Sequence, residues 1–204
     1  MLEVKNLVFA YPGQESPWNF QFSVAPGQCI AIHGASGSGK STLMNLLAGF
    51  LEPQSGDILW QGESLRYCAP WQRPMTSVFQ EHNLFEHLSV EANIGLGIHP
   101  GLKLTPKDQQ AIERGLQSVG LGGFGKRLPG DLSGGQRQRV ALLRAMLRKQ
   151  PIMLLDEPLT GLDSEARALL RQLLLKQKTQ GALIVLASHD EEDRLILADS
   201  VCRL

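Results

Sequence analysis

The sequence has few cysteines and no excess of charge. Cys29, Cys68 and Cys202 are widely and irregularly spaced, with no CxxC pair. This argues against a disulfide framework or a cysteine-based zinc site and favours reduced thiols. The 20 basic and 20 acidic residues give a formal net charge of zero. Nonspecific binding to nucleic acid or to a membrane surface needs a surplus of Lys and Arg, so we expect no nucleic-acid partner.

Long apolar runs and metal-binding motifs are also missing. The longest apolar stretches, such as residues 182–187, are far shorter than the roughly 20 residues that span a bilayer. If the protein works at a membrane, other chains must cross it. The five histidines form no HExxH pattern, so we expect all but His189 to be structural or surface residues. A composition of 43% apolar and 20% charged residues is that of an ordinary globular domain.

The apolar pattern predicts strands and helices in alternation. Residues 20–24 alternate as in a half-buried strand, and residues 28–33 form a nearly continuous apolar run, as in a strand buried on both faces. After a glycine-rich loop, apolar residues spaced at i, i+3, i+4 and i+7 predict one face of a helix. Its residues are Leu43, Leu46, Leu47 and Phe50. Residues 57–60, between glycines, predict a further strand.

The middle of the chain predicts helices, and the last quarter returns to strands. Thr105, Pro106 and Asp108 form a helix start with an N-cap, a first-turn proline and an acid. Further on, residues 152–155 and 182–187 predict buried strands on either side of a helix over 164–179. A strand-helix-strand order implies parallel pairing, with ligands at the carboxyl ends of the strands. Gly34, Asp156 and His189 all lie at such ends.

A glycine-rich loop follows the first buried strand. Its residues match the pattern GxxxxGK[ST] and are Gly34, Ala35, Ser36, Gly37, Ser38, Gly39, Lys40 and Ser41, with Thr42 next. Glycines let successive N–H groups wrap an anion, and the following helix presents its positive end. Lys40 brings a charge to the β- and γ-phosphates, and the Ser41 hydroxyl is a ligand suited to Mg²⁺. The alternative, a flexible glycine turn, does not account for the strand before it and the amphipathic helix after it.

Two acids follow the strand at 152–155. Asp156 is predicted to hold the Mg²⁺ shell, and Glu157 to orient or deprotonate an attacking water. Without the glycine-rich loop elsewhere in the chain, a solvent-facing pair of acids would be the default interpretation.

A second candidate anion site begins another helix. Ser133 is a good N-cap, and Gly134, Gly135 and Gln136 leave the helix start open to close approach. Taken alone, this segment could be an ordinary capped helix.

These motifs occur together in the order and approximate spacing of a known family. They are Gly34–Thr42, Gln80, Leu132–Gln136, Leu154–Pro158, Asp163 and His189. The chain resembles an ATP-binding cassette (ABC) nucleotide-binding domain from about residue 2 onward. The resemblance implies one α/β domain over 1–204: a P-loop NTPase core with a mostly parallel sheet, an N-terminal antiparallel β subdomain and an inserted α-helical subdomain. The core and β subdomain would occupy about 1–81 and 151–204, and the helices about 82–150.

The resemblance also implies residue roles. Tyr11 matches the aromatic residue that stacks on adenine, Gln80 the glutamine that reaches Mg²⁺ and the attacking water, and His189 the histidine that hydrogen-bonds the γ-phosphate. Each has a plainer interpretation: a core tyrosine, a loop glutamine and a structural histidine. The implied cofactors are ATP and Mg²⁺.

Cassettes of this family dimerise head to tail. The resemblance therefore implies that Ser133, Gly134, Gly135 and Gln136 of one protomer contact the γ-phosphate bound by the other. Asp163 lies in the loop that crosses the interface. The family more often has Ser-Ala where this chain has Thr160 and Gly161.

Residues 80–104 resemble bacterial import ATPases, above all those of thiamine importers, while polyamine, iron and sulphate importers share much of this region. The implied function is to couple ATP hydrolysis to import at the cytoplasmic face of the bacterial inner membrane. The partners would be integral permease subunits and, indirectly, a periplasmic solute-binding protein. Leu84, Phe85 and Leu88 are candidates for permease contact, or ordinary core residues. A soluble ABC ATPase and a nucleotide-gated module without turnover are the alternatives.

Overall fold

A five-stranded parallel sheet forms the centre of the protein. The structure is a computed structural model that describes residues 1–79 and 84–204. The strand order is β6-β7-β8-β3-β9, and neighbouring strands in this sheet run parallel. The strands are β3 (Cys29–His33), β6 (Met75–Val78), β7 (Ile152–Asp156), β8 (Leu183–Ala187) and β9 (Ser200–Arg203).

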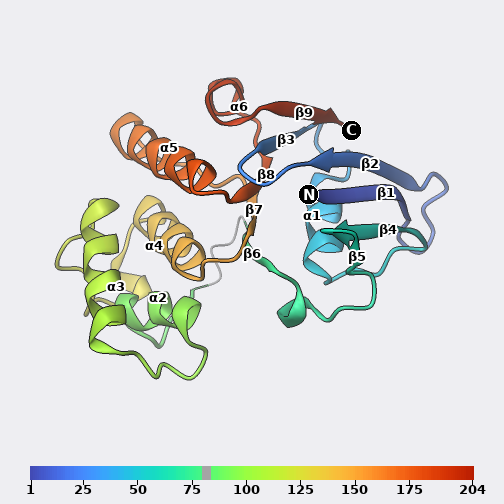
Figure 1. Cartoon of the computed structure of the whole chain (residues 1–204). Coiled ribbons are helices and arrows are strands. Elements are labelled where there is room, and N and C mark those ends of the chain that lie inside the picture. The colour runs from blue at the N-terminus through green and yellow to red at the C-terminus, as the bar shows by residue number, and fades with distance from the viewer. Residues whose placement is uncertain (80–83) are drawn as a thin grey trace.

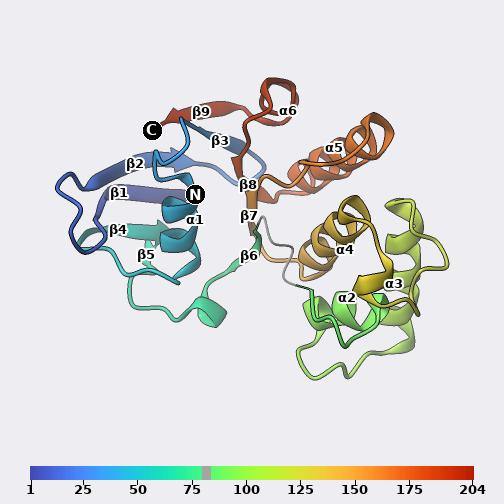
Figure 2. The same cartoon turned by 180° about the vertical axis from the view of Figure 1, so that it is seen from behind.

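A second, antiparallel sheet comes mainly from the N-terminal part of the chain. Its order is β2-β1-β4-β5. These strands are β1 (Leu2–Phe9), β2 (Trp18–Val24), β4 (Ser55–Trp60) and β5 (Glu63–Ser64). Helix α1 (Lys40–Ala48) lies beside this sheet, and the other helices lie across the parallel sheet from it (Figures 1 and 2). They are α2 (Val90–Ile98), α3 (Pro106–Ser118), α4 (Gly134–Leu147), α5 (Ser164–Thr179) and α6 (Glu191–Leu197).

The parallel sheet separates two apolar cores. Successive residues of a strand point to opposite faces, and β7 shows the result: Leu154 packs with α1 and the antiparallel sheet, whereas Leu155 packs with the helices on the other side. All five residues of β7 and of β8 are buried. Burial on both faces explains why these segments read as continuous apolar runs in the sequence. The expected α/β architecture, with a mostly parallel sheet, an antiparallel sheet and helices between β6 and β7, is confirmed.

The local signals for helix α3 are also confirmed. The Thr105 side chain accepts a hydrogen bond from the Asp108 N–H, the Asp108 carboxylate accepts from the Thr105 N–H, and Pro106 is the first helical residue. Together these contacts satisfy donors that a helix start otherwise leaves unpaired.

One predicted helix position is wrong. Helix α1 ends at Ala48 because Gly49 adopts a left-handed conformation, with φ of 84°. Phe50 therefore does not continue the buried face of Leu43, Leu46 and Leu47, and 59% of it is exposed.

Gly56, in β4, brings the two middle strands of the antiparallel sheet to close range. Its φ is +84°, and a Cβ there would lie 2.1 Å from the Asn6 carbonyl oxygen in β1. Gly62 has a similar φ of +88°, but nothing in the described chain lies within 4 Å of its Cβ position.

We expect Gly62→Ala to cost about 1 kcal/mol through backbone strain alone. Gly56→Ala should cost about 3 kcal/mol, because the facing backbone must also move. Urea unfolding of both variants measures the difference. Equal losses would mean that the close approach at Gly56 contributes nothing.

Candidate active site

The polar segments predicted at strand ends meet at one cavity. It has a volume of about 280 Å³ and lies at the carboxyl ends of β3 and β7 and just beyond β8. Its lining residues come from the glycine-rich loop, the start of α1, the two acids at the end of β7, the segment after β8, and β2. They are Trp18, Ser36, Gly37, Gly39, Lys40, Ser41, Thr42, Asp156, Glu157 and His189.

The glycine-rich loop is folded around its lysine. Gly37 and Gly39 have φ of 80° and 99°, which L side chains rarely adopt. The Lys40 Nζ donates to the carbonyl oxygens of Gly34 and Ala35 at 2.8 and 2.9 Å. These bonds hold the ammonium group within the loop. The N-terminus of α1 begins at the same place. The arrangement concentrates positive charge and N–H donors at one place, as an anion site requires.

Ser38 and Gly34 also fit closely within this loop. A Cβ on Gly34 would lie 2.4 Å from the Ser38 Oγ. That hydroxyl is buried without a hydrogen-bond partner among the described residues. Buried polar groups are normally satisfied, so the Ser38 hydroxyl is suited to a partner that occupies the loop.

Ser41 and Asp156 connect the loop to the central sheet. The Ser41 Oγ donates to the Asp156 Oδ2 at 3.1 Å. Burial raises the pKa of the Asp156 carboxyl, while the hydrogen bond from Ser41 opposes that effect. A hydroxyl and a carboxylate are oxygen ligands of the kind that Mg²⁺ prefers. Within residues 1–79 and 84–204, no cluster of three or more His, Cys, Asp or Glu side chains could hold a metal alone. Phosphate oxygens and water would have to complete the shell.

Glu157 is held from two neighbouring turns. Its Oε1 accepts the His189 N–H at 2.9 Å, and its Oε2 accepts the Thr160 hydroxyl at 2.9 Å. The His189 Nε2 lies 3.5 Å from the Glu157 Oε1. The backbone of Glu157 has φ of 51°, which is uncommon for a residue other than glycine. The carboxylate thus lines the cavity beside an exposed imidazole.

The second candidate anion site lies apart from this cavity. Ser133 and Gln136 form a capping box, in which the Ser133 hydroxyl accepts the Gln136 N–H and the Gln136 side chain accepts the Ser133 N–H. None of the described atoms comes within 4 Å of a Cβ placed on Gly134, whereas Gly135 is close to Leu162. Asp163 caps α5 by accepting the Ala166 N–H at 2.8 Å. None of these residues lines the cavity of the same protomer.

Two remaining predicted residues differ in what can be said of them. Tyr11 is 43% exposed and meets Phe9 and Trp18 edge to face, with ring centroids 4.9 and 5.9 Å apart. It adjoins a residue that lines the cavity but is not itself in the lining. Gln80 lies outside the described residues.

Trp18 and Thr160 contribute to the site and were missed in the sequence. A Cβ on Gly39 would lie 2.8 Å from the Trp18 Nε1, so the indole packs directly on the glycine-rich loop. Trp18 pairs with Phe9 across β2 and β1, and no local pattern in the sequence signals that pairing. Thr160 was noted only as a departure from a family motif, although its hydroxyl contacts Glu157.

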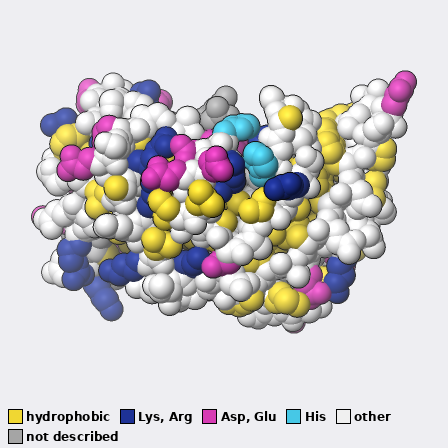
Figure 3. Space-filling view, turned by 90° about the horizontal axis from the view of Figure 1, so that it is seen from above, with side chains coloured by type: hydrophobic (Ala, Val, Ile, Leu, Met, Phe, Trp, Pro, Cys, Tyr) yellow, Lys and Arg dark blue, Asp and Glu magenta, His cyan; other side chains and the backbone are white. Residues whose placement is uncertain are grey.

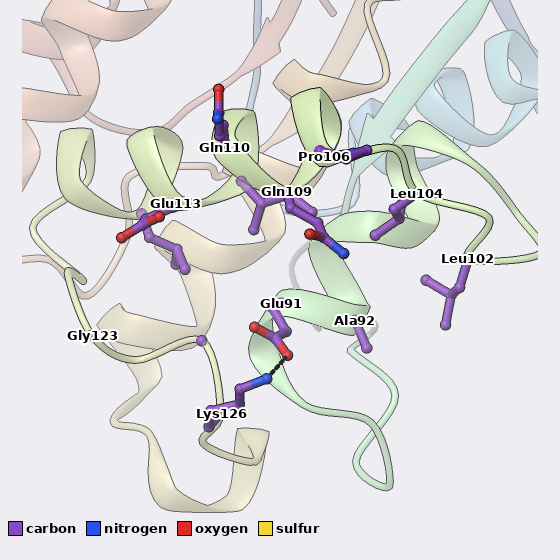
Figure 4. A pocket seen from close by; sticks show the side chains of 13 residues that line it. Glu91, Ala92, Leu102, Leu104, Pro106, Gln109, Gln110, Glu113, Gly123 and Lys126 are labelled. Carbon is purple, nitrogen blue, oxygen red and sulfur yellow. Dashed lines mark hydrogen bonds and ion pairs between the residues drawn. The ribbon is translucent and has the colours of Figure 1, made fainter.

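A larger cavity, of about 660 Å³, lies among α2, α3 and the loop before α4. Figure 4 shows Glu91 and Lys126 paired at its edge, at 2.6 Å. None of the predicted site residues lines it.

Comparisons with known proteins show the family of this chain. A comparison with protein families matches residues 18–160 to the family described as ABC transporter. The chain belongs to the ABC transporter family. The chain is 49% identical over 183 residues to the thiamine import ATP-binding protein ThiQ of Rhizobium meliloti (strain 1021), which covers 89% of this chain and 77% of that protein. It is 44% identical over 199 residues to the protein of the same name from Vibrio parahaemolyticus, covering 97% and 84%.

The fold also matches solved ABC structures. The TM-score is 0.89, at 26% identity, to a dimeric structure of a post-hydrolysis state of the ATP-binding cassette MJ0796 bound to ADP and Pi. The match covers all of this chain and 94% of that one. The predicted family and fold are therefore confirmed, and the family binds nucleotide.

We expect Tyr11 and Trp18 to contribute to ATP affinity in different ways. Tyr11→Ala should weaken ATP binding about tenfold through lost base stacking and leave tripolyphosphate binding unchanged. Trp18→Ala should weaken both, because the indole also supports Gly39. Calorimetric titration with both ligands measures this, with exposed Tyr67→Ala as the control. If Tyr11→Ala weakened tripolyphosphate as much as ATP, Tyr11 would not be a base-stacking residue.

Proposed function

We propose that this chain is the ATP-hydrolysing subunit of a bacterial importer for thiamine. The observation that carries the proposal is 42–49% identity, over most of the chain, to proteins named thiamine import ATP-binding protein. The cavity supports the hydrolytic part, because its phosphate loop, acids and histidine come from separate segments and converge on one volume.

In this proposal the loop from Gly34 to Thr42 binds the triphosphate. Its N–H groups and the Lys40 ammonium contact the phosphate oxygens, and Tyr11 stacks on the adenine. Lys40 is already oriented by its bonds to Gly34 and Ala35, so little side-chain entropy is lost when phosphate binds.

Ser41, Asp156 and Gln80 would hold Mg²⁺ together with the phosphates. The two that the structure describes fit that role, because a hydroxyl and a buried carboxylate lie 3.1 Å apart. A divalent ion would neutralise charge on the phosphate oxygens. It would also favour the ionised form of Asp156, whose pKa burial raises.

Glu157 would act as the general base and His189 as the γ-phosphate contact. Glu157 accepts two hydrogen bonds and lies beside the cavity, so its carboxylate is oriented before a water arrives. The side chain of His189 is 60% exposed, which leaves its imidazole accessible to phosphate. In this proposal Gln80 also contacts the attacking water.

The proposed working unit is a head-to-tail homodimer. The capped helix start at Ser133–Gln136 does not line the cavity of its own protomer, and no described atom lies within 4 Å of a Cβ placed on Gly134. A second protomer would place this helix start against the γ-phosphate, with Asp163 at the interface. The dimeric cassette structures similar to this chain support that arrangement.

An exposed aromatic groove is the proposed contact with the permease. It has a volume of about 600 Å³, and its aromatic lining consists of Phe50, Trp71, Phe79 and Phe85. Trp71 is 77% and Phe85 49% exposed. Contiguous apolar surface of this kind marks interaction sites. Leu84 packs against the helical core instead, so of the candidate residues Phe85 is the best placed.

No helix in the described part of the chain is long and apolar enough to cross a bilayer. We propose that the protein binds peripherally at the cytoplasmic face of the inner membrane. Its permease would pass on solute from a periplasmic binding protein, and nucleic acid has no role.

We expect Glu157→Gln to lower ATP hydrolysis at least a hundredfold while ATP binding remains. In cells that lack the native gene, the wild type should restore uptake of labelled thiamine and Glu157→Gln should not. Exposed Glu113→Gln is the matched control. If thiamine uptake were independent of this gene while the purified protein hydrolysed ATP, the transported solute would be another, or the ATPase a soluble one.

We expect the double change Trp71→Ala and Phe85→Ala to leave ATP hydrolysis by the isolated subunit unchanged. Co-purification with the permease and thiamine uptake should both be lost. Leu195→Ala, a change at an apolar residue that is 76% exposed elsewhere, is the control. Undiminished co-purification would place the permease contact on another surface.

A further inference from the structure

We propose that Arg167 is a positioning residue for ATP hydrolysis, because its guanidinium joins the segment after Glu157 to the segment that carries His189. The proposal rests on the proposed function. Arg167 lies near the start of α5, and 24% of its side chain is exposed. It lines neither the nucleotide cavity, nor the cavity among α2 and α3, nor the aromatic groove.

The guanidinium bonds to both segments at once. Its Nη1 pairs with the Asp190 Oδ2 at 2.5 Å, and its Nη2 donates to the Leu159 carbonyl oxygen at 3.4 Å. Asp190 directly follows His189, and Leu159 lies two residues after Glu157. A planar guanidinium presents its N–H donors in a rigid fork, whereas the ammonium of a lysine is a compact point charge on a flexible stem.

Asp190 passes this restraint to the turn that carries His189. Its Oδ1 accepts the Asp193 N–H and caps α6, while its own N–H donates to the Ser188 Oγ at 3.2 Å. The hydrogen bond from Asp193, with that from Arg167, holds the pKa of Asp190 below its usual range. The carboxylate therefore remains charged and paired at neutral pH.

This set of hydrogen bonds reaches Glu157 and His189, the two groups that we propose act in hydrolysis. The His189 N–H donates to the Glu157 Oε1 at 2.9 Å, and the Glu157 N–H donates to the Ala187 carbonyl oxygen at 2.9 Å. The turns after β7 and β8 are thus joined directly at Glu157 and again through Arg167 behind it. Because Glu157 has a strained backbone, a support behind it helps to keep the carboxylate in place.

A second arginine of α5, Arg171, packs this helix against α6 and allows the role of Arg167 to be tested separately. Arg171 is 8% exposed and joins α5 to α6 through Asp193 at 2.6 Å and Glu192 at 2.9 Å. Its contact with the Asp190 Oδ1 is longer, at 3.8 Å. From above, acidic and basic side chains lie side by side, with histidine nearby (Figure 3). We therefore expect the two helices to stay docked through Arg171 when Arg167 is removed.

The test compares steady-state hydrolysis and thermal unfolding for matched variants. Arg167→Ala should lower kcat about tenfold or more, with KM for ATP within about twofold, since the misplaced groups act on the water and not on the bound phosphates. Its Tm should stay within a few degrees of wild type, because the pair is partly exposed. Arg171→Ala should show the reverse: a large fall in Tm from the broken buried pair and a smaller loss of kcat.

Asp190→Asn removes the carboxylate that pairs with Arg167, together with its longer contact to the Arg171 Nη2 at 3.8 Å. Asparagine still caps α6 but no longer forms an ion pair, so kcat should fall as in Arg167→Ala. The double variant should be no worse than Asp190→Asn alone, because that change already removes the ion pair with Arg167. Arg167→Lys should recover part of the rate.

Provided that the wild-type protein hydrolyses ATP, three results would overturn the proposal. They are an unchanged kcat in Arg167→Ala, a rise in KM without loss of kcat, and additive losses in the double variant. A wild-type protein that hydrolyses no ATP, even with its permease, would instead count against the proposed function.

Discussion

The burial of β3, β7 and β8 on both faces is the constraint on which the rest of the structure depends. Each strand contributes alternate side chains to two separate cores, so none of them can shift by one residue without exchanging the faces of its side chains. Fixed register and parallel direction bring the carboxyl ends of the strands to one edge. The glycine-rich loop, the acids after β7 and His189 leave the sheet there and are held as a group.

The polar residues at that edge support one another across long gaps in the sequence. Ser41 at the start of α1 bonds to Asp156 at the end of β7, and Glu157 bonds to the turn after β8. Behind them, the arginines of α5 bond to the turn after β8 and to α6. The groups that we propose as catalytic are thus supported by rigid elements rather than by a single flexible loop.

Much of this could be predicted from the sequence, because the signals were local. The cap of α3 at Thr105, the buried strand before Asp156 and the loop from Gly34 to Ser41 each carry their structure within a few residues. Trp18 could not be placed, because its contact with Gly39 depends on strand pairing. Phe50 was misplaced because the helical spacing continued past Gly49, where the backbone turns. Arg167 was missed for a related reason: its partners, Leu159 and Asp190, meet only in the folded chain.

The backbone and the side chain of Glu157 favour different residues at this position. The backbone there has a φ of 51°, where glycine would rest with less strain, but glycine has no carboxylate. In the proposed role of general base, the carboxylate is needed at the cost of some backbone strain. Substitution at this residue would then be limited twice, once by the side chains that this backbone conformation tolerates and once by the need for a group that takes a proton from water.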